Sequence, residues 1–316
     1  MTFMIYSSAN YTDPAAKVGA GVQAASEHGY QVVGGSCPAV GVAGGWVPGG
    51  GHGPLTGAYG LGADNALEFE VITTEGKRLI ASPTQNLDLY WALSGGGPGN
   101  YAVVISITTK AHIDVPVVGA KFDFENTDYD TFYAAITAYM KHLLVLDNLV
   151  GFKAVGAFAR DLFRMDFATW PGATVQDMNA AWAPFLSELE ALNISLTFND
   201  TKLFPTFYEH YKYFGTDVYT RNATAGSCFI PRWQVEDNER NLPELVDTMR
   251  SMAKNYSAVL NVINSNVTHL RVDNTPESNS VCPGWRDSLA NLVIVIPVLE
   301  DAPWTELKAR QAVMND

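Results

Sequence analysis

The stretch GGSCPAVGVAGGWVPGGGHGPLTGAYGLGADN, residues 34–65, decides how the chain is interpreted. It holds twelve of the 27 glycines, and a glycine inside a helix or strand costs roughly 0.5–1 kcal/mol relative to alanine. Such a stretch is therefore a loop, in which either bare backbone approaches a flat or phosphorylated ligand or the chain turns repeatedly with positive φ. It is not a phosphate loop, because no lysine follows the glycines, and it lacks a GxGxxG turn that opens a helix.

The sequence after this loop predicts regular elements. Residues 67–82 alternate apolar and acidic side chains up to a turn at Glu75–Gly76, which predicts a β-hairpin. Residues 86–93 predict a short helix with Asp88 in its first turn, where a carboxylate suits the helix dipole. The β-branched run 103–109 predicts a buried strand.

The glycine-rich texture ends near residues 112–116, and we place a domain boundary there. Residues 1–112 form the first predicted domain and residues 113–316 the second. The second domain alternates strands and amphipathic helices irregularly, which indicates an α+β domain whose helices cover one face of an antiparallel sheet. Its predicted strands are residues 118–124, 162–169, 258–263 and 292–299, and its predicted helices are residues 131–146, 175–192 and 242–254.

Charge and length limit the classes of partner. The chain has 316 residues, with 20 Lys and Arg against 33 Asp and Glu, a net charge of −13. An acidic protein of this kind repels nucleic acid and anionic membrane surfaces. No apolar run approaches the ~20 residues that span a bilayer. We therefore expect a globular protein that binds neither nucleic acid nor a membrane. We also expect a monomer without a metal site.

Glycosylation sequons point to the secretory pathway. The pattern Asn-x-Ser/Thr occurs six times, which is typical of a secreted glycoprotein, although a polar surface rich in Asn and Thr would also produce chance matches. The first 13 residues have no charged leader and no apolar segment, so they are not a signal peptide. The sequons are at Asn10, Asn193, Asn199, Asn222, Asn255 and Asn266.

The chain has three cysteines, an odd number. We expect Cys228 and Cys282 to form a disulfide, which would close a loop of about 55 residues and contribute roughly 4 kcal/mol, and Cys37 to stay free. The alternative is that all three are buried thiols that behave as small hydrophobic residues.

Four motifs in order carry a family resemblance: GSCPAVGVAGG at 35–45, GLGADN at 60–65, DLYWALSGGG at 88–97 and the strand at 103–109. Together they resemble the PCMH-type flavin-binding domain of the vanillyl alcohol oxidase superfamily. The closest likeness is to the berberine bridge enzyme-like FAD-linked oxidases, in particular the fungal isoamyl alcohol oxidase-like branch. Beyond His112 the resemblance rests on domain order and short pieces such as CPGWRDSL at 282–289.

The resemblance implies an FAD-dependent oxidoreductase. In such an enzyme a substrate C–H, of an alcohol, sugar or amine, gives a hydride to covalently bound FAD, and O2 reoxidises the flavin. The small-molecule substrate and O2 are then the expected partners, and secretion is expected of this group. A catalytic base does not follow from the sequence, because geometry has to choose among many tyrosines and carboxylates.

The family's cofactor contacts can be transferred by position. Cys37 matches a cysteine that forms a thioether to C6 of the isoalloxazine ring. The block around it matches backbone that lines the flavin, and the glycines after Gly49 match the following turn, in which His52 is interpreted as a solvated residue. The implied cofactor-binding residues are Cys37, Gly35, Ser36, Val40, Gly41, Val42, Gly44, Gly45, Gly50, Gly51, Gly53, Val103 and Val104.

Two departures from the family pattern shape the alternatives. The sequence contains neither the Arg-Ser-Gly-Gly-His-like turn that carries a histidine link nor the closing Asn-Tyr motif, so we expect a chain truncated at both ends. The first alternative is accordingly a non-catalytic remnant that binds FAD weakly or not at all. A second is a carbohydrate-binding module that uses aromatic residues such as Trp46 and Trp285, but it leaves Cys37 and GLGADN unexplained.

Overall fold

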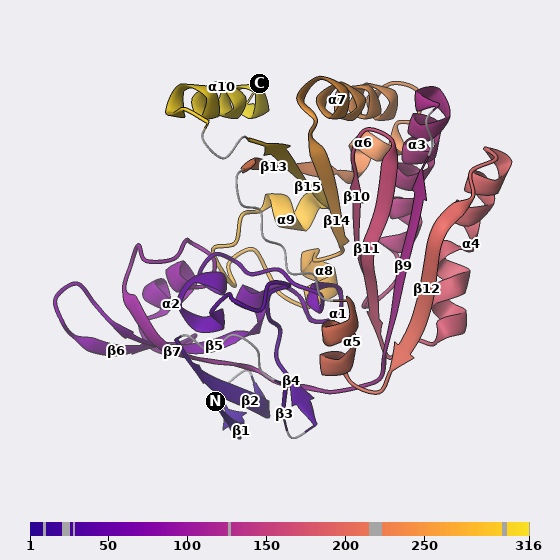
Figure 1. Cartoon of the computed structure of the whole chain (residues 1–316). Coiled ribbons are helices and arrows are strands. Elements are labelled where there is room, and N and C mark those ends of the chain that lie inside the picture. The colour runs from indigo at the N-terminus through magenta and orange to yellow at the C-terminus, as the bar shows by residue number, and fades with distance from the viewer. Residues whose placement is uncertain are drawn as a thin grey trace. The chain divides into compact units, whose positions relative to one another are not determined.

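The computed structural model describes residues 1–8, 11–20, 26–27, 29–125, 128–214, 223–298 and 302–315. Contacts divide the chain into two compact units, and Figure 1 shows the elements of each. Both units combine helices with antiparallel strands, which confirms the α+β prediction. Unit 1 comprises Met1–Val117, Phe204–Asp217 and Val267–Arg286, and unit 2 comprises Val118–Leu203, Val218–Asn266 and Asp287–Asp316. Sequence reasoning placed one break after residue 112 and did not include the two later segments of unit 1.

Unit 1 is built on a five-stranded sheet in the order β1-β2-β7-β5-β6, with antiparallel neighbours throughout. The predicted hairpin is present, because β5 pairs with β6 across the turn at Gly76. A second, small sheet joins β3, β4 and β8. The strands are β1 (Thr2–Ser7), β2 (Thr12–Gly19), β3 (Ser26–Glu27), β4 (Tyr30–Gln31), β5 (Ala66–Ile72), β6 (Arg78–Ala81), β7 (Val103–Lys110) and β8 (His112–Ile113).

The helices of unit 1 are short and lie in the loops around this sheet. The predicted helix is α2, with Asn86 at its N-cap and Asp88 in its first turn. The buried-strand prediction for β7 is only half right, because Val103 and Ile105 are 66% and 39% exposed while the residues between and after them are buried. The helices are η1 (Val42–Trp46), α1 (Thr56–Tyr59), η2 (Gly62–Asn65), α2 (Leu87–Leu93), α5 (Phe207–Phe214), α8 (His269–Val272) and α9 (Gly284–Asp287).

Unit 2 is a seven-stranded sheet in the order β12-β9-β11-β10-β14-β15-β13. The pairs β10–β11, β10–β14, β14–β15 and β13–β15 are antiparallel. The strands are β9 (Val117–Glu125), β10 (Lys153–Phe158), β11 (Leu162–Pro171), β12 (Leu196–Phe204), β13 (Ala223–Pro231), β14 (Val259–Ser265) and β15 (Ser288–Pro297). All four strands that the sequence predicts in this half are therefore present, the last beginning four residues earlier than expected.

Helices cover one face of this sheet, as Figure 1 shows for α3, α4 and α7. A single hydrophobic cluster joins alternate strand residues such as Phe122 and Phe163 to Tyr139 of α3, Phe185 of α4 and Met249 of α7. The three predicted helices begin and end within two residues of those observed. The helices are α3 (Tyr129–Leu146), α4 (Val175–Ala191), α6 (Arg232–Glu236), α7 (Asn241–Tyr256) and α10 (Trp304–Asn315).

The expected disulfide is wrong, because all three cysteines are free thiols. Cys228 lies on β13 of unit 2, opposite Leu292 of β15, whereas Cys282 belongs to a segment of unit 1. The alternative of three buried thiols is wrong as well, since Cys228 and Cys282 are exposed and Cys37 is half-buried.

The sequons differ in their surroundings. Asn193, Asn199 and Asn255 are exposed. Asn266 is not, because its side-chain amide donates to the Asp147 carbonyl at 3.0 Å and to the Asp147 carboxylate at 3.2 Å. A glycan there would break both hydrogen bonds. Asn10 and Asn222 lie outside the described residues.

Within the described part of the chain, no helix combines the length and the apolar character that crossing a membrane requires.

Candidate functional site

The turn that carries Cys37 is held at both ends. The Tyr211 hydroxyl of α5 donates to the Ser36 carbonyl at 3.0 Å, and the Val40 amide donates to the Cys37 carbonyl at 3.3 Å. The chain then enters η1, a π-helical turn in which the Val47 amide donates to the Val42 carbonyl. Cys37 itself is half-buried, so its thiol stands on a fixed turn at the protein surface. No sequence signal pointed to Tyr211.

Some glycines of the loop are required by the protein's own packing. A Cβ at Gly62 would lie 2.4 Å from the Trp46 ring and one at Gly51 2.8 Å from it, and Gly51 also has a φ of +72°. A Cβ at Gly53 would lie 1.8 Å from the Gly34 carbonyl oxygen. The half-buried Trp46 ring therefore packs against the protein's own backbone, which does not favour the carbohydrate-platform alternative for this side chain.

Other glycines of the loop have no such reason. A Cβ at Gly45 would meet nothing within 4 Å, and one at Gly44 would touch only the Ala20 Cβ at 3.8 Å. Both residues are exposed, and neither has a left-handed φ. Bare backbone at Gly44 and Gly45, seven and eight residues after Cys37, is thus not demanded by the fold. It leaves the space that a flat ligand needs to lie against the main chain, so these residues fit a flavin.

The remaining predicted residues of the loop occupy different environments. Val40 is 38% exposed, whereas Val42 is 1% exposed and belongs to the core of unit 1. Gly41 caps η1 in an extended conformation. A Cβ at Gly35 would lie 3.1 Å from the Trp46 ring nitrogen, and Gly50 has a φ of +96°. The predicted set therefore includes both exposed residues and residues whose side chains pack in the core of unit 1.

The strand residues and His52 complete the predicted set. Val104 on β7 shares the hydrophobic cluster of Val42, while Val103 points outward. The His52 ring lies 5.3 Å from the Trp285 ring, so His52 is not the fully solvated turn residue that we expected. Among the described residues, no group of three or more His, Cys, Asp and Glu side chains could hold a metal ion.

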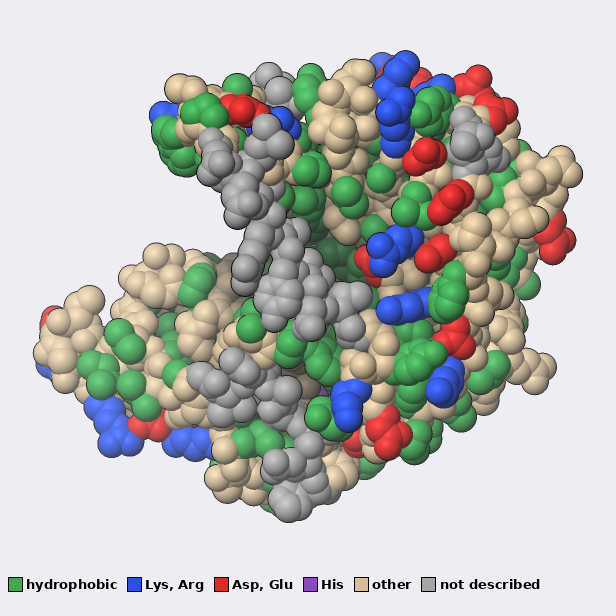
Figure 2. Space-filling model, in the orientation of Figure 1, with side chains coloured by type: hydrophobic (Ala, Val, Ile, Leu, Met, Phe, Trp, Pro, Cys, Tyr) green, Lys and Arg blue, Asp and Glu red, His purple; other side chains and the backbone are tan. Residues whose placement is uncertain are grey.

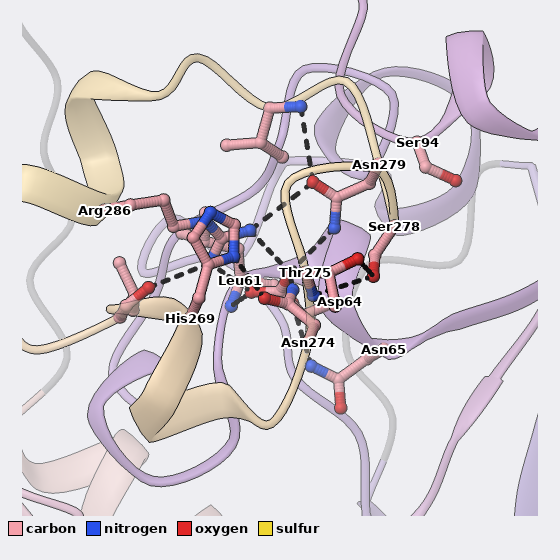
Figure 3. Close-up of polar contacts among 12 residues, drawn as sticks. Leu61, Asp64, Asn65, Ser94, His269, Asn274, Thr275, Ser278, Asn279 and Arg286 are labelled. Carbon is pink, nitrogen blue, oxygen red and sulfur yellow. Dashed lines mark hydrogen bonds and ion pairs between the residues drawn. The ribbon is translucent and has the colours of Figure 1, made fainter.

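Asp64, in the motif GLGADN, is the centre of a buried polar cluster (Figure 3). Arg286 donates to both carboxylate oxygens, at 3.0 and 2.7 Å. The amides of Asn274 and Asn279 each donate to one of these oxygens at 2.8 Å, and the Leu61 backbone amide donates to the other at 2.9 Å. The two charged side chains are 3% and 4% exposed. Charge-assisted hydrogen bonds thus fix the end of the glycine loop to a segment about 220 residues further along the chain.

Asn65, the next residue, ties the loop to β8. Its amide donates to the carbonyls of Tyr59 and Leu61, which leaves its side-chain oxygen as the acceptor for His112 Nε2 at 2.8 Å. The His112 ring stacks on Tyr59 with 3.8 Å between centroids. Burial lowers the pKa of His112 to about 4. The imidazole is therefore neutral at pH 7, with its proton on Nε2.

Comparison with known proteins gives the family. No protein-family model matches the chain. The FAD-linked oxidoreductase sthB of Phaeosphaeria nodorum is 43% identical over 215 residues, which cover 65% of this chain and 68% of that protein. The crystal structure of the VAO-type flavoprotein MtVAO615 from Myceliophthora thermophila C1 has a TM-score of 0.85 at 32% identity, covering 98% of this chain and 57% of that one. Glucooligosaccharide oxidase from Acremonium strictum shares the fold, with a TM-score of 0.72 at 18% identity, over 96% of this chain and 65% of that one.

The chain belongs to the FAD-linked oxidoreductases of the VAO/PCMH flavoprotein family. Its structural neighbours include proteins of the berberine bridge enzyme-like group. It spans about half the length of several curated relatives that it matches. The resemblance predicted from the four motifs is thus confirmed at the level of the family. The Asp64–Arg286 contact joins the motif GLGADN to the piece CPGWRDSL in this chain.

Two glycine variants separate glycines that the fold needs from those that it does not. Gly62→Ala should destabilise the protein by about 1–3 kcal/mol, because the new methyl group overlaps the Trp46 ring. Gly45→Ala should leave stability unchanged or raise it by up to about 1 kcal/mol, since the site is open and alanine restricts the unfolded chain. Urea unfolding of both variants measures this, and equal losses would contradict it.

Asp64→Asn tests the buried ion pair. The variant keeps the shape of the side chain but leaves the Arg286 guanidinium buried without a counter-charge, which should cost about 3–5 kcal/mol in unfolding free energy. Glu244→Gln is the matched control, because its partner Arg240 is 79% exposed and the pair is solvated. We expect the control to unfold like the wild type. A small effect of Asp64→Asn would mean that the cluster does not hold the loop.

His112 should make stability depend on pH. The unfolded chain binds a proton on this histidine below about pH 6.5, whereas the folded protein resists protonation down to about pH 4. The contribution of neutral His112 to the unfolding free energy is therefore complete above pH 6.5. As the pH falls to about 4, the unfolding free energy decreases by about 3 kcal/mol on this account. His112→Gln should lack this loss, so the gap in unfolding free energy between wild type and variant should narrow on acidification. Parallel pH profiles would refute the assignment.

Proposed function

We propose that this chain carries the cofactor-facing loop and the substrate domain of an FAD-dependent oxidase. The enzyme would take a hydride from a C–H bond of a small alcohol, sugar or amine and pass the electrons to O2. The observation that carries the proposal is that the loop of the half-buried Cys37 thiol also holds Gly44 and Gly45, whose lack of side chains the packing does not explain. The family membership of the chain gives this surface its chemistry.

Several residues would hold the cofactor. Bound FAD supplies the hydride acceptor and the route of electrons to O2. The Cys37 sulfur would attach the flavin as a thioether, and the open backbone at Gly44 and Gly45 would lie against it. Tyr211 positions this turn through the Ser36 carbonyl. The glucooligosaccharide oxidase of Acremonium strictum has a 6-S-cysteinyl, 8α-N1-histidyl FAD, which supports a cysteinyl link in this fold.

The finer features of the proposal rest on the sequence. The exposed sequons at Asn193, Asn199 and Asn255 support a secreted glycoprotein. A place in the isoamyl alcohol oxidase-like branch remains a prediction from the resemblance, and a monomer remains a prediction from the sequence. The neighbouring oxidases act on carbohydrates in several solved cases, which supports a polyhydroxylated substrate as one of the classes to be tried.

Peptide mapping of the purified protein tests the cysteinyl link. The proteolytic peptide that contains Cys37 should carry the mass of a flavin, and in Cys37→Ser this adduct should be lost. Cys228→Ser is the matched control, because it removes an exposed thiol from β13 and should leave the adduct intact.

Two results would count against the proposal. A flavin-containing protein whose Cys37 is recovered as an alkylated thiol would refute the thioether. A folded protein that stays colourless when refolded or expressed with excess FAD would favour the remnant that does not retain the cofactor.

A further inference from the structure

A row of three polar side chains crosses the centre of the sheet of unit 2. Lys153 begins β10 and is directly opposite Thr169 of β11 on one side and Ser265 of β14 on the other. Residues that face each other on neighbouring antiparallel strands have Cβ atoms about 4.5–5.5 Å apart and share one face of the sheet. The three residues are 1%, 0% and 6% exposed. The register therefore places one cation between two hydroxyl groups in a buried position.

The row lies on the face of the sheet opposite to α3, α4 and α7. Along β10, Ala154 and Phe158 belong to the hydrophobic cluster beneath α3, α4 and α7. Side chains alternate between the two faces of a strand, so Lys153 points to the opposite face. On that face, over β9, β11 and β12, acidic and basic side chains are intermingled, as Figure 2 shows on the right of the molecule. Lys121 and Asp123 of β9 lie on that face too, because the alternate residues Ala120, Phe122 and Phe124 belong to the cluster beneath the helices.

Two polar atoms of the row have no hydrogen-bond partner among the residues that the structure describes. They are Lys153 Nζ and Ser265 Oγ, both fully buried. Burial alone lowers the pKa of Lys153 to about 7. An ammonium group that is removed from water without a partner costs several kcal/mol, and a buried hydroxyl without one adds to that cost. Lys153 therefore weakens the fold and gains no hydrogen bond from the described part of the protein, which is typical of a group that serves a ligand.

The chemistry of the row selects its ligand. It offers hydrogen-bond donors from one cation and one hydroxyl, so two acceptor oxygens on a ligand would satisfy both. A single negative charge would balance the ammonium, whereas a phosphate dianion would leave an excess charge buried. A neutral hydroxyl would leave the ammonium uncompensated. A carboxylate meets both conditions, since it has two oxygens and one charge.

We propose that Lys153 and Ser265 form a binding site for a carboxylate group, which accepts hydrogen bonds from Nζ and Oγ. Thr169 borders the site on the other side of Lys153. If the chain is an FAD-dependent oxidase as proposed above, the site would select substrates that carry a carboxylate in addition to the oxidised C–H. That last step rests on the proposed function, whereas carboxylate binding does not.

Binding of acetate to the whole chain tests the site, with acetamide as the neutral probe of the same shape. Sodium acetate should raise the thermal unfolding midpoint of the wild type and acetamide should not. Lys153→Met should abolish the response to acetate. Ser265→Ala should weaken binding by about tenfold, the effect of one lost hydrogen bond to a charged group. Lys121→Met, on the same face of the sheet, is the matched control and should respond like the wild type.

A second measurement separates a binding role from a structural one. Lys153→Met should have a higher urea midpoint than the wild type, because an apolar side chain replaces a buried, unpartnered cation. Lys153→Arg, which keeps the charge, should retain a response to acetate. A Lys153→Met protein that is less stable than the wild type would mean that Lys153 supports the fold, and this would overturn the proposal.

The outcomes distinguish this proposal from the one on which its substrate class rests. An acetate response that persists undiminished in Lys153→Met, or no response in a folded wild type, would overturn the carboxylate site. If acetate binding depends on Lys153 while the Cys37 peptide carries no flavin, the site stands and the oxidase proposal fails. If the Cys37 peptide carries a flavin and the folded wild type does not bind acetate, the oxidase proposal stands and the carboxylate site fails.

Discussion

The buried ion pair between Asp64 and Arg286 is the contact on which the geometry of unit 1 depends. A carboxylate inside a protein needs hydrogen bonds for every lone pair that faces inward, and Asp64 obtains them from a guanidinium, two side-chain amides and one backbone amide. These donors come from both ends of the chain. Residues far along the chain therefore determine the shape of the glycine loop. Asn65, the residue after Asp64, also attaches the loop to β8 through its hydrogen bond with His112.

Because Asp64 fixes one end of the loop, the backbone at Gly44 and Gly45 can remain without packing contacts. The glycines near Trp46 satisfy internal packing, while those at 44 and 45 leave space toward the outside. A loop made only of the second kind would lack packing contacts to restrain it, and each of its glycines would lose more conformational entropy on folding than another residue would. The first kind, together with Trp46 and the Tyr211 hydrogen bond, restrains the turn on which Cys37 stands.

Local patterns in the sequence predicted much of the fold. The β5–β6 hairpin and the helices α3, α4 and α7 follow their alternation or their helical periodicity, since each buries one face. The strand β10 escaped prediction because its sequence KAVGAF alternates small residues and starts with a lysine that is buried. The pairing of β1 with β2 was likewise missed, since Pro14 and Lys17 interrupt an apolar pattern.

The site was predictable only in part, for a related reason. Glycine density marks the loop and the family resemblance marks Cys37, but no spacing in the sequence connects Asp64 to Arg286 or Ser36 to Tyr211. Such contacts are made by the tertiary fold. The same holds for Lys153, whose neighbours Thr169 and Ser265 come from two other strands, and for Cys228 and Cys282, which spacing suggested as a pair although they belong to different units.

The division of unit 1 into three segments has a consequence for biosynthesis. Its first 117 residues leave the ribosome before any of unit 2, yet Arg286 follows about 170 residues later. At 5–20 residues per second this delay amounts to roughly 8–34 s. During that interval Asp64 has no guanidinium partner, and the glycine loop is an incomplete nascent structure with apolar residues such as Val281 not yet in place. Unit 2 is completed later still, because β15, which pairs with both β13 and β14, lies in its last segment, Asp287–Asp316. Molecular chaperones that shield nascent chains would therefore meet incomplete surfaces on both units while the chain is being synthesised.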